Sequence, residues 1–189
     1  MEKEFWDNRW LNQQLGWDIG QVSTPLKEFF DTIEDKSIKI LIPGAGNSYE
    51  AEYLHSEGFK NVYVADISFH ALNSFKERCP DFPSEHMLNV DFFQIDDQYD
   101  LIVEQTFFCA LHPSRRNEYA KKMKSLLKEN GKLIGVLFDR SFDAGPPFGG
   151  NKKEYLEIFE TYFDQIEMVP CNNSVKPRMG TELWIEICN

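Results

Sequence analysis

The stretch that decides the fold is residues 38–48, with the sequence IKILIPGAGNS. Its first half is a β-branched apolar run, which is typical of a buried strand, and its second half is a glycine-rich turn. Asn47 or Ser48 is expected to cap the helix that follows. A second apolar strand over 62–65 ends at Asp66. This order of strand, glycine turn, helix, strand and terminal acid indicates the first half of a nucleotide-binding α/β unit.

The glycine turn and the acid point to a bound nucleotide. Gly44 and Gly46 allow the backbone to approach a ligand closely, and Asp66 follows at about the 20-residue distance from which such an acid accepts hydrogen bonds from a ribose. Asp66 can also cap the next helix, so a structural role stays open. Tyr49 replaces the third glycine of the G-x-G-x-x-G pattern of nicotinamide and flavin enzymes. The residues favour an adenosine-containing cofactor.

The rest of the chain alternates between helical and strand patterns, without an internal repeat or a linker. Strand and helix alternation predicts a mostly parallel sheet. No helix separates the last two strands, so they are expected to be antiparallel neighbours. Helices are expected over 4–14, 24–35, 68–79, 113–128 and 151–162, and further strands over 87–90, 100–104, 132–138, 165–169 and 182–188. The buried face of the fourth of these helices is expected to carry Tyr119, Met123, Leu126 and Leu127.

The composition limits the possible partners. A length of 189 residues suits one well-filled domain. The net charge of −11 opposes binding to a nucleic-acid backbone or an anionic membrane surface, and no apolar run approaches the length of a membrane span. The residues Met1–Glu4 lack the apolar segment of a signal peptide, and the four cysteines form no C-x-x-C pair. We therefore expect a cytoplasmic protein with reduced thiols and no metal site.

Aromatic residues near the predicted nucleotide site favour a cationic cofactor. Two aromatic-acid stretches, 91–93 and 104–108, fall where a parallel sheet would place the carboxyl ends of its strands. Trp6 and Trp10 share one face of the first predicted helix, and Trp17 follows. Tryptophans in such a place are usually core anchors. Aromatic faces also stabilise cations, which suits the sulfonium of S-adenosylmethionine.

Several motifs, in their order and spacing, carry a resemblance to a known family. They are FWDNRW at 5–10, GWDIG at 16–20, IPGAG at 42–46, DIS at 66–68, DFF at 91–93, TFFCAL at 106–111, GPPF at 145–148 and RMGTE at 178–182. Over nearly its whole length the chain resembles class I S-adenosylmethionine-dependent methyltransferases of the thiopurine S-methyltransferase family, which includes thiol and halide methyltransferases.

The resemblance implies a Rossmann-like class I methyltransferase sandwich. This α/β fold has a mostly parallel central sheet with an antiparallel C-terminal strand, plus an N-terminal helical lid. The chain would be a single domain, 1–189, with the lid and helices in 1–36 and the α/β core in 37–189. The residues expected to bind S-adenosyl-L-methionine, and S-adenosylhomocysteine as product, are Trp6, Trp10, Trp17, Gly44, Gly46, Asp66, Ile67, Asp91, Phe92, Glu104 and Gln105. Asp91 can alternatively cap a turn.

The resemblance also implies a substrate side, with Phe108, Pro146, Pro147, Phe148 and Arg178. Candidates for contact with the reacting groups are Glu104, Gln105, Phe107 and His112, of which Glu104, Gln105, Phe107 and Phe108 are expected to form an apolar floor. Arg178 can instead pair with Glu182. The mammalian branch has an arginine, and plant enzymes tend to have a tyrosine, where this chain has Gln105.

We therefore expect methyl transfer by in-line displacement to a small soft nucleophile, such as a thiol, hydrosulfide, halide or thiopurine-like acceptor. A desolvated thiolate needs no strong general base, which fits the lack of an evident acid–base pair. The alternatives are a non-catalytic S-adenosylmethionine-binding protein and a methyltransferase for another small molecule. A nucleic-acid methyltransferase is opposed by the acidic charge, and a dehydrogenase by the missing glycine. We expect a monomer.

Overall fold

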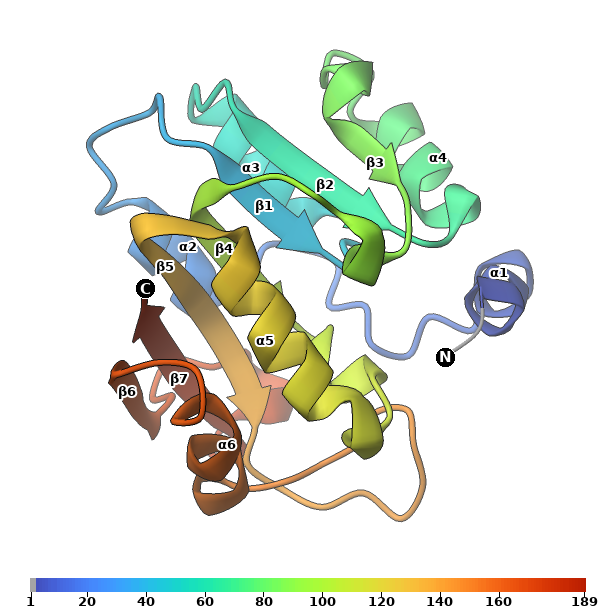
Figure 1. The fold of residues 1–189 in the computed structure, drawn as a ribbon. Helices are drawn as coiled ribbons and strands as arrows, with labels where there is room; N and C mark the ends of the chain where they lie inside the picture. The colour runs from blue at the N-terminus through green and yellow to red at the C-terminus, as the bar shows by residue number, and fades with distance from the viewer. Residues whose placement is uncertain (1–2) are drawn as a thin grey trace.

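One mixed sheet forms the centre of the molecule. The structure, a computed structural model, describes residues 3–189. Within these residues, the strands follow the order β3-β2-β1-β4-β5-β7-β6 (Figure 1). Their bounds are β1 (Ile40–Pro43), β2 (Val62–Asp66), β3 (Met87–Asn89), β4 (Tyr99–Gln105), β5 (Leu127–Phe138), β6 (Gln165–Pro170) and β7 (Glu182–Cys188). β7 pairs antiparallel with both β5 and β6, and the other pairings are parallel, which confirms the predicted topology.

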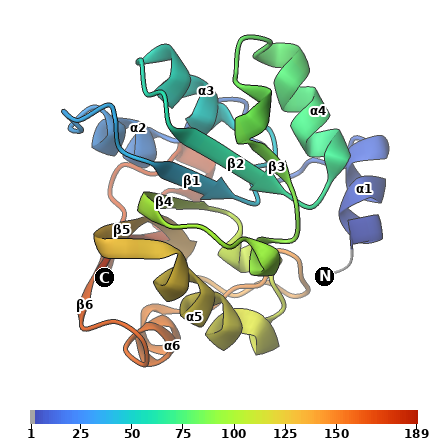
Figure 2. The ribbon, with the colours of Figure 1, turned by 45° about the horizontal axis from the view of Figure 1, so that its top comes forward.

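Helices cover both faces of this sheet, as right-handed crossovers between parallel strands require. Helices α2, α3 and α4 pack on one face and α5 and α6 on the other, while α1 lies beside α4 (Figure 2). Their bounds are α1 (Lys3–Leu11), α2 (Thr24–Phe30), α3 (Tyr49–Ser56), α4 (Phe69–Arg78), α5 (Arg116–Leu126) and α6 (Lys152–Phe159). Within residues 3–189, no helix has the length and apolar character needed to cross a membrane.

Two apolar cores result, one on each face of the sheet. The first includes Tyr119, Met123 and Leu126 of α5 and Phe159 of α6. The second includes Leu26 of α2 together with residues of α3 and α4. The predicted buried face of α5 is confirmed, because its side chains and Leu127 are at most 1% exposed.

Two helices end earlier than the sequence indicated, and a third lacks the expected side-chain cap. α1 ends at Leu11 and α2 at Phe30, earlier than expected. Ser48 occupies the N-cap position of α3, but its hydroxyl donates to the carbonyl of Ala45 (3.3 Å). The expected side-chain cap by Asn47 or Ser48 is therefore wrong.

The largest difference concerns the start of β5. A helix over 113–128 and a strand beginning at Lys132 were expected, but β5 already begins at Leu127. Leu127 pairs with Tyr99 of β4 and is buried, which ends α5 at Leu126. Asn130 (φ 64°) then accommodates a register shift between the two strands.

β4 and β5 approach so closely that one position of β5, Gly135, has no room for a side chain. A Cβ on Gly135 would lie 2.1 Å from the carbonyl oxygen of Glu104 and 2.6 Å from the Glu104 Cβ. Because these atoms belong to the central strands, we predict that Gly135→Ala lowers the free energy of unfolding by about 2 kcal/mol or more. Urea denaturation monitored by circular dichroism measures this loss.

Gly16→Ala is the matched control, since a Cβ at Gly16 meets no atom within 4 Å. Its effect should stay within about 0.5 kcal/mol. Equal denaturation midpoints for the two variants would contradict the proposed close approach.

Candidate functional site

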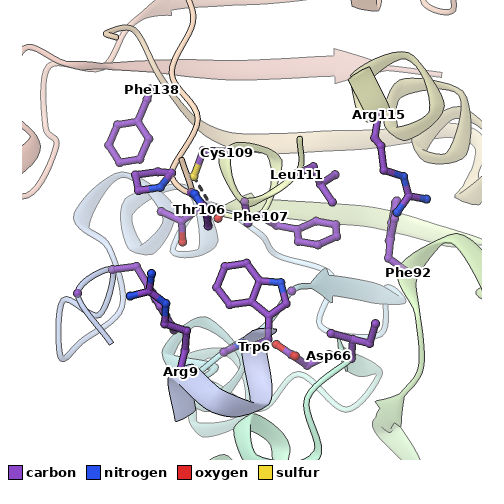
Figure 3. A pocket seen from close by; sticks show the side chains of 18 of the residues that line it. Trp6, Arg9, Asp66, Phe92, Thr106, Phe107, Cys109, Leu111, Arg115 and Phe138 are labelled. Carbon is purple, nitrogen blue, oxygen red and sulfur yellow. Dashed lines mark hydrogen bonds between the residues drawn. The ribbon is translucent and has the colours of Figure 1, made fainter. Parts of the chain in front are cut away.

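A cavity, called the main cavity below, lies where the parallel strands end. Its volume is about 480 Å³, within the size range of small-molecule sites. Its wall contains residues that follow four of the parallel strands, namely Gly44, Asp66, Asp91 and Thr106, together with residues of α1 (Figure 3). The cavity thus lies at the edge of the sheet where open α/β folds bind ligands.

The glycine turn after β1 forms the centre of this wall. Gly44 (φ 59°) and Gly46 (φ 53°) both have left-handed backbone conformations, which glycine adopts without strain. A Cβ at Gly44 would lie 2.2 Å from a ring carbon of Phe107, and a Cβ at Gly46 would point toward Trp17 (3.8 Å). A side chain at Gly44 would overlap the Phe107 ring, and the left-handed conformation favours glycine at both positions, so the turn presents bare backbone.

Asp66 links this turn to the end of β2. Its Oδ2 accepts a hydrogen bond from the Gly46 N–H (3.0 Å), and its Oδ1 accepts one from the Ser68 N–H (2.8 Å). Burial raises the pKa of this carboxyl to about 6. Because each oxygen has a second lone pair, the residue can cap the start of α4 and still accept from a ligand.

Asp91 and Phe92 line the next part of the wall, together with Ile67. The Oδ1 of Asp91 accepts a hydrogen bond from the Phe93 N–H (2.9 Å) and so caps a short 3₁₀ turn. The turn-capping alternative is therefore correct, and the same residue also faces the cavity. Phe92 packs edge to face on Phe107, with ring centroids 5.1 Å apart.

The three N-terminal tryptophans lie over the cavity. Trp6 and Trp10 of α1 each contact Trp17 edge to face, with centroid distances of 5.4 and 6.4 Å. Trp6 points into the cavity from below in Figure 3. α1 has no fully buried residue, so this segment is held to the body by a few specific contacts.

Those contacts are polar. The hydroxyl of Ser68 donates to Asp7 of α1 (2.7 Å), and Nη2 of Arg178 donates to the carbonyl of Trp17 (2.8 Å). Asp18 accepts a hydrogen bond from the side-chain amide of Asn47, beside the glycine turn. The segment therefore docks against the start of α4, the glycine turn and the region before β7.

Glu104 does not form the floor that was expected of it. Its side chain is fully buried and points into the core, where Oε1 accepts from the N–H groups of Phe107 (2.8 Å) and Phe108 (2.9 Å). Its Oε2 accepts from the hydroxyl of Tyr119 (2.6 Å). Three donors in the interior hold the carboxylate away from the cavity, whose wall here consists of Thr106 and Phe107.

Gln105 lies on the other side of the glycine turn. It lines a separate small cavity of about 50 Å³, together with Gly44, Ala45 and Trp17. Its Oε1 is buried and has no hydrogen-bond partner within residues 3–189. The residue is therefore adjacent to the site, while Thr106 occupies the position expected for it in the main cavity.

The other end of the main cavity is mostly apolar. Its wall includes Cys109, Leu111, Phe138, Pro146 and Pro147. Burial raises the pKa of the Cys109 thiol, which donates to the carbonyl of Thr106 (3.2 Å). The raised pKa keeps the Cys109 thiol protonated.

Besides Glu104 and Gln105, three more of the expected substrate-side or reactive residues lie outside this cavity. Phe108 is in the core on α5 and α6. Phe148 packs against His112, with ring centroids 5.4 Å apart. His112 is exposed and caps the 3₁₀ turn Pro113–Arg115 through Nδ1 and the Ser114 N–H. The proline that follows His112 starts this turn and directs the imidazole to solvent.

Arg178 both lines the cavity and pairs with Glu182, while its substrate-side role stays a prediction. It lines the cavity, is 9% exposed and forms an ion pair with Glu182 (3.4 Å). Burial raises the pKa of Glu182. The guanidinium also lies 5.4 Å from the ring centroid of Phe138, so it connects β7, the end of β5 and the tryptophan segment.

Sequence reasoning missed several wall residues. Phe138 ends β5, and the rule that ligands bind at carboxyl ends of strands would have identified it. Arg9 follows Trp6 by three residues on α1 and shares its face. No local signal marks Arg140 or Phe142, which lie in the long loop after β5.

Comparisons with known proteins agree with this geometry. The family model described as thiopurine S-methyltransferase matches residues 1–182. The chain belongs to the thiopurine S-methyltransferase family. A probable thiol methyltransferase 2 of Arabidopsis thaliana is 30% identical over 94% of this chain and 81% of that protein. A thiopurine S-methyltransferase of Vibrio cholerae is 27% identical over 97% of both chains.

Solved structures show the same fold at low sequence identity. Magnesium protoporphyrin IX methyltransferase from Synechocystis, determined with bound S-adenosylmethionine, has a TM-score of 0.74 and 12% identity, covering 99% of this chain and 96% of that one. A 1,6-didemethyltoxoflavin-N1-methyltransferase of Burkholderia thailandensis has a TM-score of 0.73 and 13% identity, covering 98% and 85%.

This member of the thiopurine S-methyltransferase family is an S-adenosylmethionine-dependent methyltransferase. Its residues fit that cofactor. The bare backbone at Gly44 and Gly46, the carboxylate of Asp66 and the aromatic wall at Phe92 lie along one cavity. They present, in order, a close backbone approach, a hydrogen-bond acceptor and an apolar surface.

The buried carboxylate of Glu104 should make stability depend on pH. Burial raises its pKa to about 7, above the value near 4.5 expected for the unfolded chain. The folded state therefore holds the proton more tightly, and the resulting stabilisation is lost as the pH rises from about 4.5 to 7. We predict that this group contributes a decline of about 3 kcal/mol in the free energy of unfolding over that window.

The measurement is urea denaturation of the wild type and Glu104→Gln at several pH values. The amide keeps an acceptor for the two N–H groups but does not titrate, so the difference between the two curves isolates this carboxyl. Glu160→Gln, at an exposed position, is the control. Parallel curves for wild type and Glu104→Gln would show that the carboxyl does not carry the effect.

Proposed function

We propose that this chain transfers a methyl group to a small soft nucleophile: a thiol, hydrosulfide, halide or thiopurine-like acceptor. One observation carries the proposal. The cavity end beside Phe138, Cys109 and Pro146 is mostly apolar. Among residues 3–189, its charged lining side chains are arginines, which do not act as general bases. Such a wall desolvates an anionic nucleophile. Related proteins named thiol and thiocyanate methyltransferase support this choice.

The same geometry supports roles for the cofactor-side residues. We assign Gly44 and Gly46 to the methionine portion, Asp66 and Ile67 to the ribose, and Asp91 with Phe92 to the adenine. Trp6, Trp10 and Trp17 form a lid. The support is that these residues line the main cavity in this order from the centre of the sheet toward β3.

The residues of this chain position the acceptor and the cofactor and need not transfer a proton. When bound, S-adenosylmethionine supplies an activated methyl group, and transfer to a thiolate yields a thioether and S-adenosylhomocysteine. Thr106 and Phe107 form the wall beside the transfer path, and the lid excludes water. Cys109 stays a protonated neighbour because burial raises its pKa.

We further propose that residues 1–189 act as one domain, monomeric and cytoplasmic, without a nucleic-acid partner. The four cysteines are free thiols, as a reducing compartment favours. The acidic surface disfavours nucleic acid. The two alternatives are a non-catalytic S-adenosylmethionine-binding protein and a methyltransferase for another small molecule.

A combined binding and transfer panel tests the proposal. S-adenosylhomocysteine should raise the melting temperature and NAD should not; at a hundredfold excess over its dissociation constant a ligand adds about 2.7 kcal/mol. Labelled methyl from S-adenosylmethionine should then appear in thiophenol, hydrosulfide or iodide. Binding without transfer to any acceptor supports the non-catalytic alternative. Label in RNA, DNA or protein, and in no small thiol or halide, contradicts the proposal.

Cofactor affinity should depend on the ionisation of Asp66. The ribose hydroxyls donate to the ionised carboxylate, whose pKa in the free protein is about 6. We predict that the dissociation constant of S-adenosylhomocysteine is constant above pH 7 and rises below pH 6, approaching about tenfold per pH unit. Isothermal titration calorimetry between pH 5.5 and 8 measures it.

Asp66→Asn serves as the comparison. It should bind more weakly at pH 8 and show no rise between pH 7 and 5.5, because the amide does not titrate. A wild-type affinity that is independent of pH in this range would mean that another group holds the ribose.

A further inference from the structure

The charge of the cavity wall is opposite to that of the whole chain. The protein has 31 acidic and 20 basic residues, with a net charge of −11. The charged residues lining the main cavity nevertheless comprise two carboxylates, Asp66 and Asp91, and four guanidinium groups, Arg9, Arg115, Arg140 and Arg178. A ligand in this cavity therefore meets an excess of positive charge.

Two of these arginines have partners within the protein. Arg115 lies 3.7 Å from the ring centroid of Phe93, near the proposed adenine side, and pairs with Glu118 (2.9 Å). Arg178 pairs with Glu182. Their charges are thus balanced by neighbouring carboxylates.

Arg9 and Arg140 have no such partner within residues 3–189. Neither guanidinium lies within 4.0 Å of a carboxylate oxygen or donates a hydrogen bond to a described group. Each instead lies over an aromatic ring, Arg9 over Phe5 (5.1 Å) and Arg140 over Phe142 (4.8 Å). Stacking leaves the N–H edges of a guanidinium available for an oxyanion.

The two arginines lie at the acceptor end of the cavity. Arg140 follows Phe138 at the end of β5, and β5 is two strands away from β1 in the sheet. Neighbouring strands are about 4.8 Å apart, so Arg140 is roughly 10 Å from the glycine turn along the sheet. Arg9 reaches in from α1 on the side facing Thr106 (Figure 3).

We propose that Arg9 and Arg140 form a subsite for a carboxylate that the acceptor carries apart from its nucleophile. The inference rests on the proposed S-methylation and specifies its substrate class: thiols with a second, anionic group. An oxyanion between two guanidinium groups gains charge-assisted hydrogen bonds. The wall around it is apolar, which fits an aromatic or short aliphatic body.

A pair of acceptors that differ in charge tests the subsite. 4-Mercaptobenzoate and its neutral amide, 4-mercaptobenzamide, have similar shapes, and kcat/KM is measured for each at a pH where both thiols are ionised. The wild type should prefer the carboxylate about tenfold or more. Arg140→Gln and Arg9→Gln should each lower this ratio about tenfold, while Arg140→Lys keeps part of it because the charge remains.

Lys60→Gln is the control, since it removes one positive charge at an exposed site outside the cavity and should keep the ratio. Melting curves verify that each variant folds. Transfer to both thiols without a preference in the wild type overturns the subsite and leaves S-methylation intact. No transfer to either thiol, with transfer to thiophenol, hydrosulfide or iodide intact, also overturns the subsite and leaves the proposed function standing. No transfer to any of these acceptors overturns the proposed function, and the subsite with it.

The cofactor also carries a carboxylate, which could be the anion that Arg9 and Arg140 bind in place of an acceptor carboxylate. The dissociation constant of S-adenosylhomocysteine is therefore measured for each variant. A weaker affinity for this ligand, with an unchanged ratio of the two acceptors, would assign the arginines to the cofactor and overturn the proposal. Unchanged affinity with a lowered ratio supports it.

Discussion

The buried carboxylate of Glu104 is the interaction on which the cavity depends. It accepts hydrogen bonds from two successive N–H groups, of Phe107 and Phe108, and from the hydroxyl of Tyr119. These bonds fix the turn after β4, in which Thr106 has a positive φ of 59°. This turn places the Phe107 ring so close to Gly44 that no side chain fits at position 44. One carboxylate thus determines how the loops after β1 and β4 meet. Gly135 is part of the same constraint, because it lets β5 pass directly beside Glu104.

This arrangement suits a reaction that depends on the orientation of its reactants more than on proton transfer. Glu104 cannot serve as a general base for an acceptor, because it is fully buried, does not line the cavity and already accepts three hydrogen bonds from the interior. The groups left to line the transfer path are Thr106, Phe107 and apolar residues such as Pro146. They can orient an acceptor and exclude water, and a soft nucleophile requires little else. The same turn that stabilises the core therefore also limits the chemistry that the cavity supports.

Most of the fold followed from local patterns, whereas the orientation of single side chains did not. The glycine turn, Asp66 and the alternation of strands and helices are readable because each depends on neighbours in the chain. Glu104 was misplaced because its three partners come from a turn and from α5, and a strand pattern does not say which face a terminal side chain takes. His112 was misplaced because the following proline starts a turn that exposes it. The assigned roles of the cofactor-side residues stay predictions.

The arginines show why charge distribution needs the three-dimensional structure. Arg9 and Arg140 are far apart in the sequence, on α1 and on the loop after β5, and in a chain with a net charge of −11 they look like ordinary surface cations. Folding brings both to one cavity, in which the lining carboxylates among residues 3–189, Asp66 and Asp91, lie on the side proposed for the cofactor. Since α1 has no fully buried residue and is held by polar contacts such as that of Asp7 with Ser68, the position of Arg9 depends on the docking of α1. An anion held by both arginines, as proposed above, would bridge α1 and the core, so acceptor binding and the docking of α1 would stabilise each other.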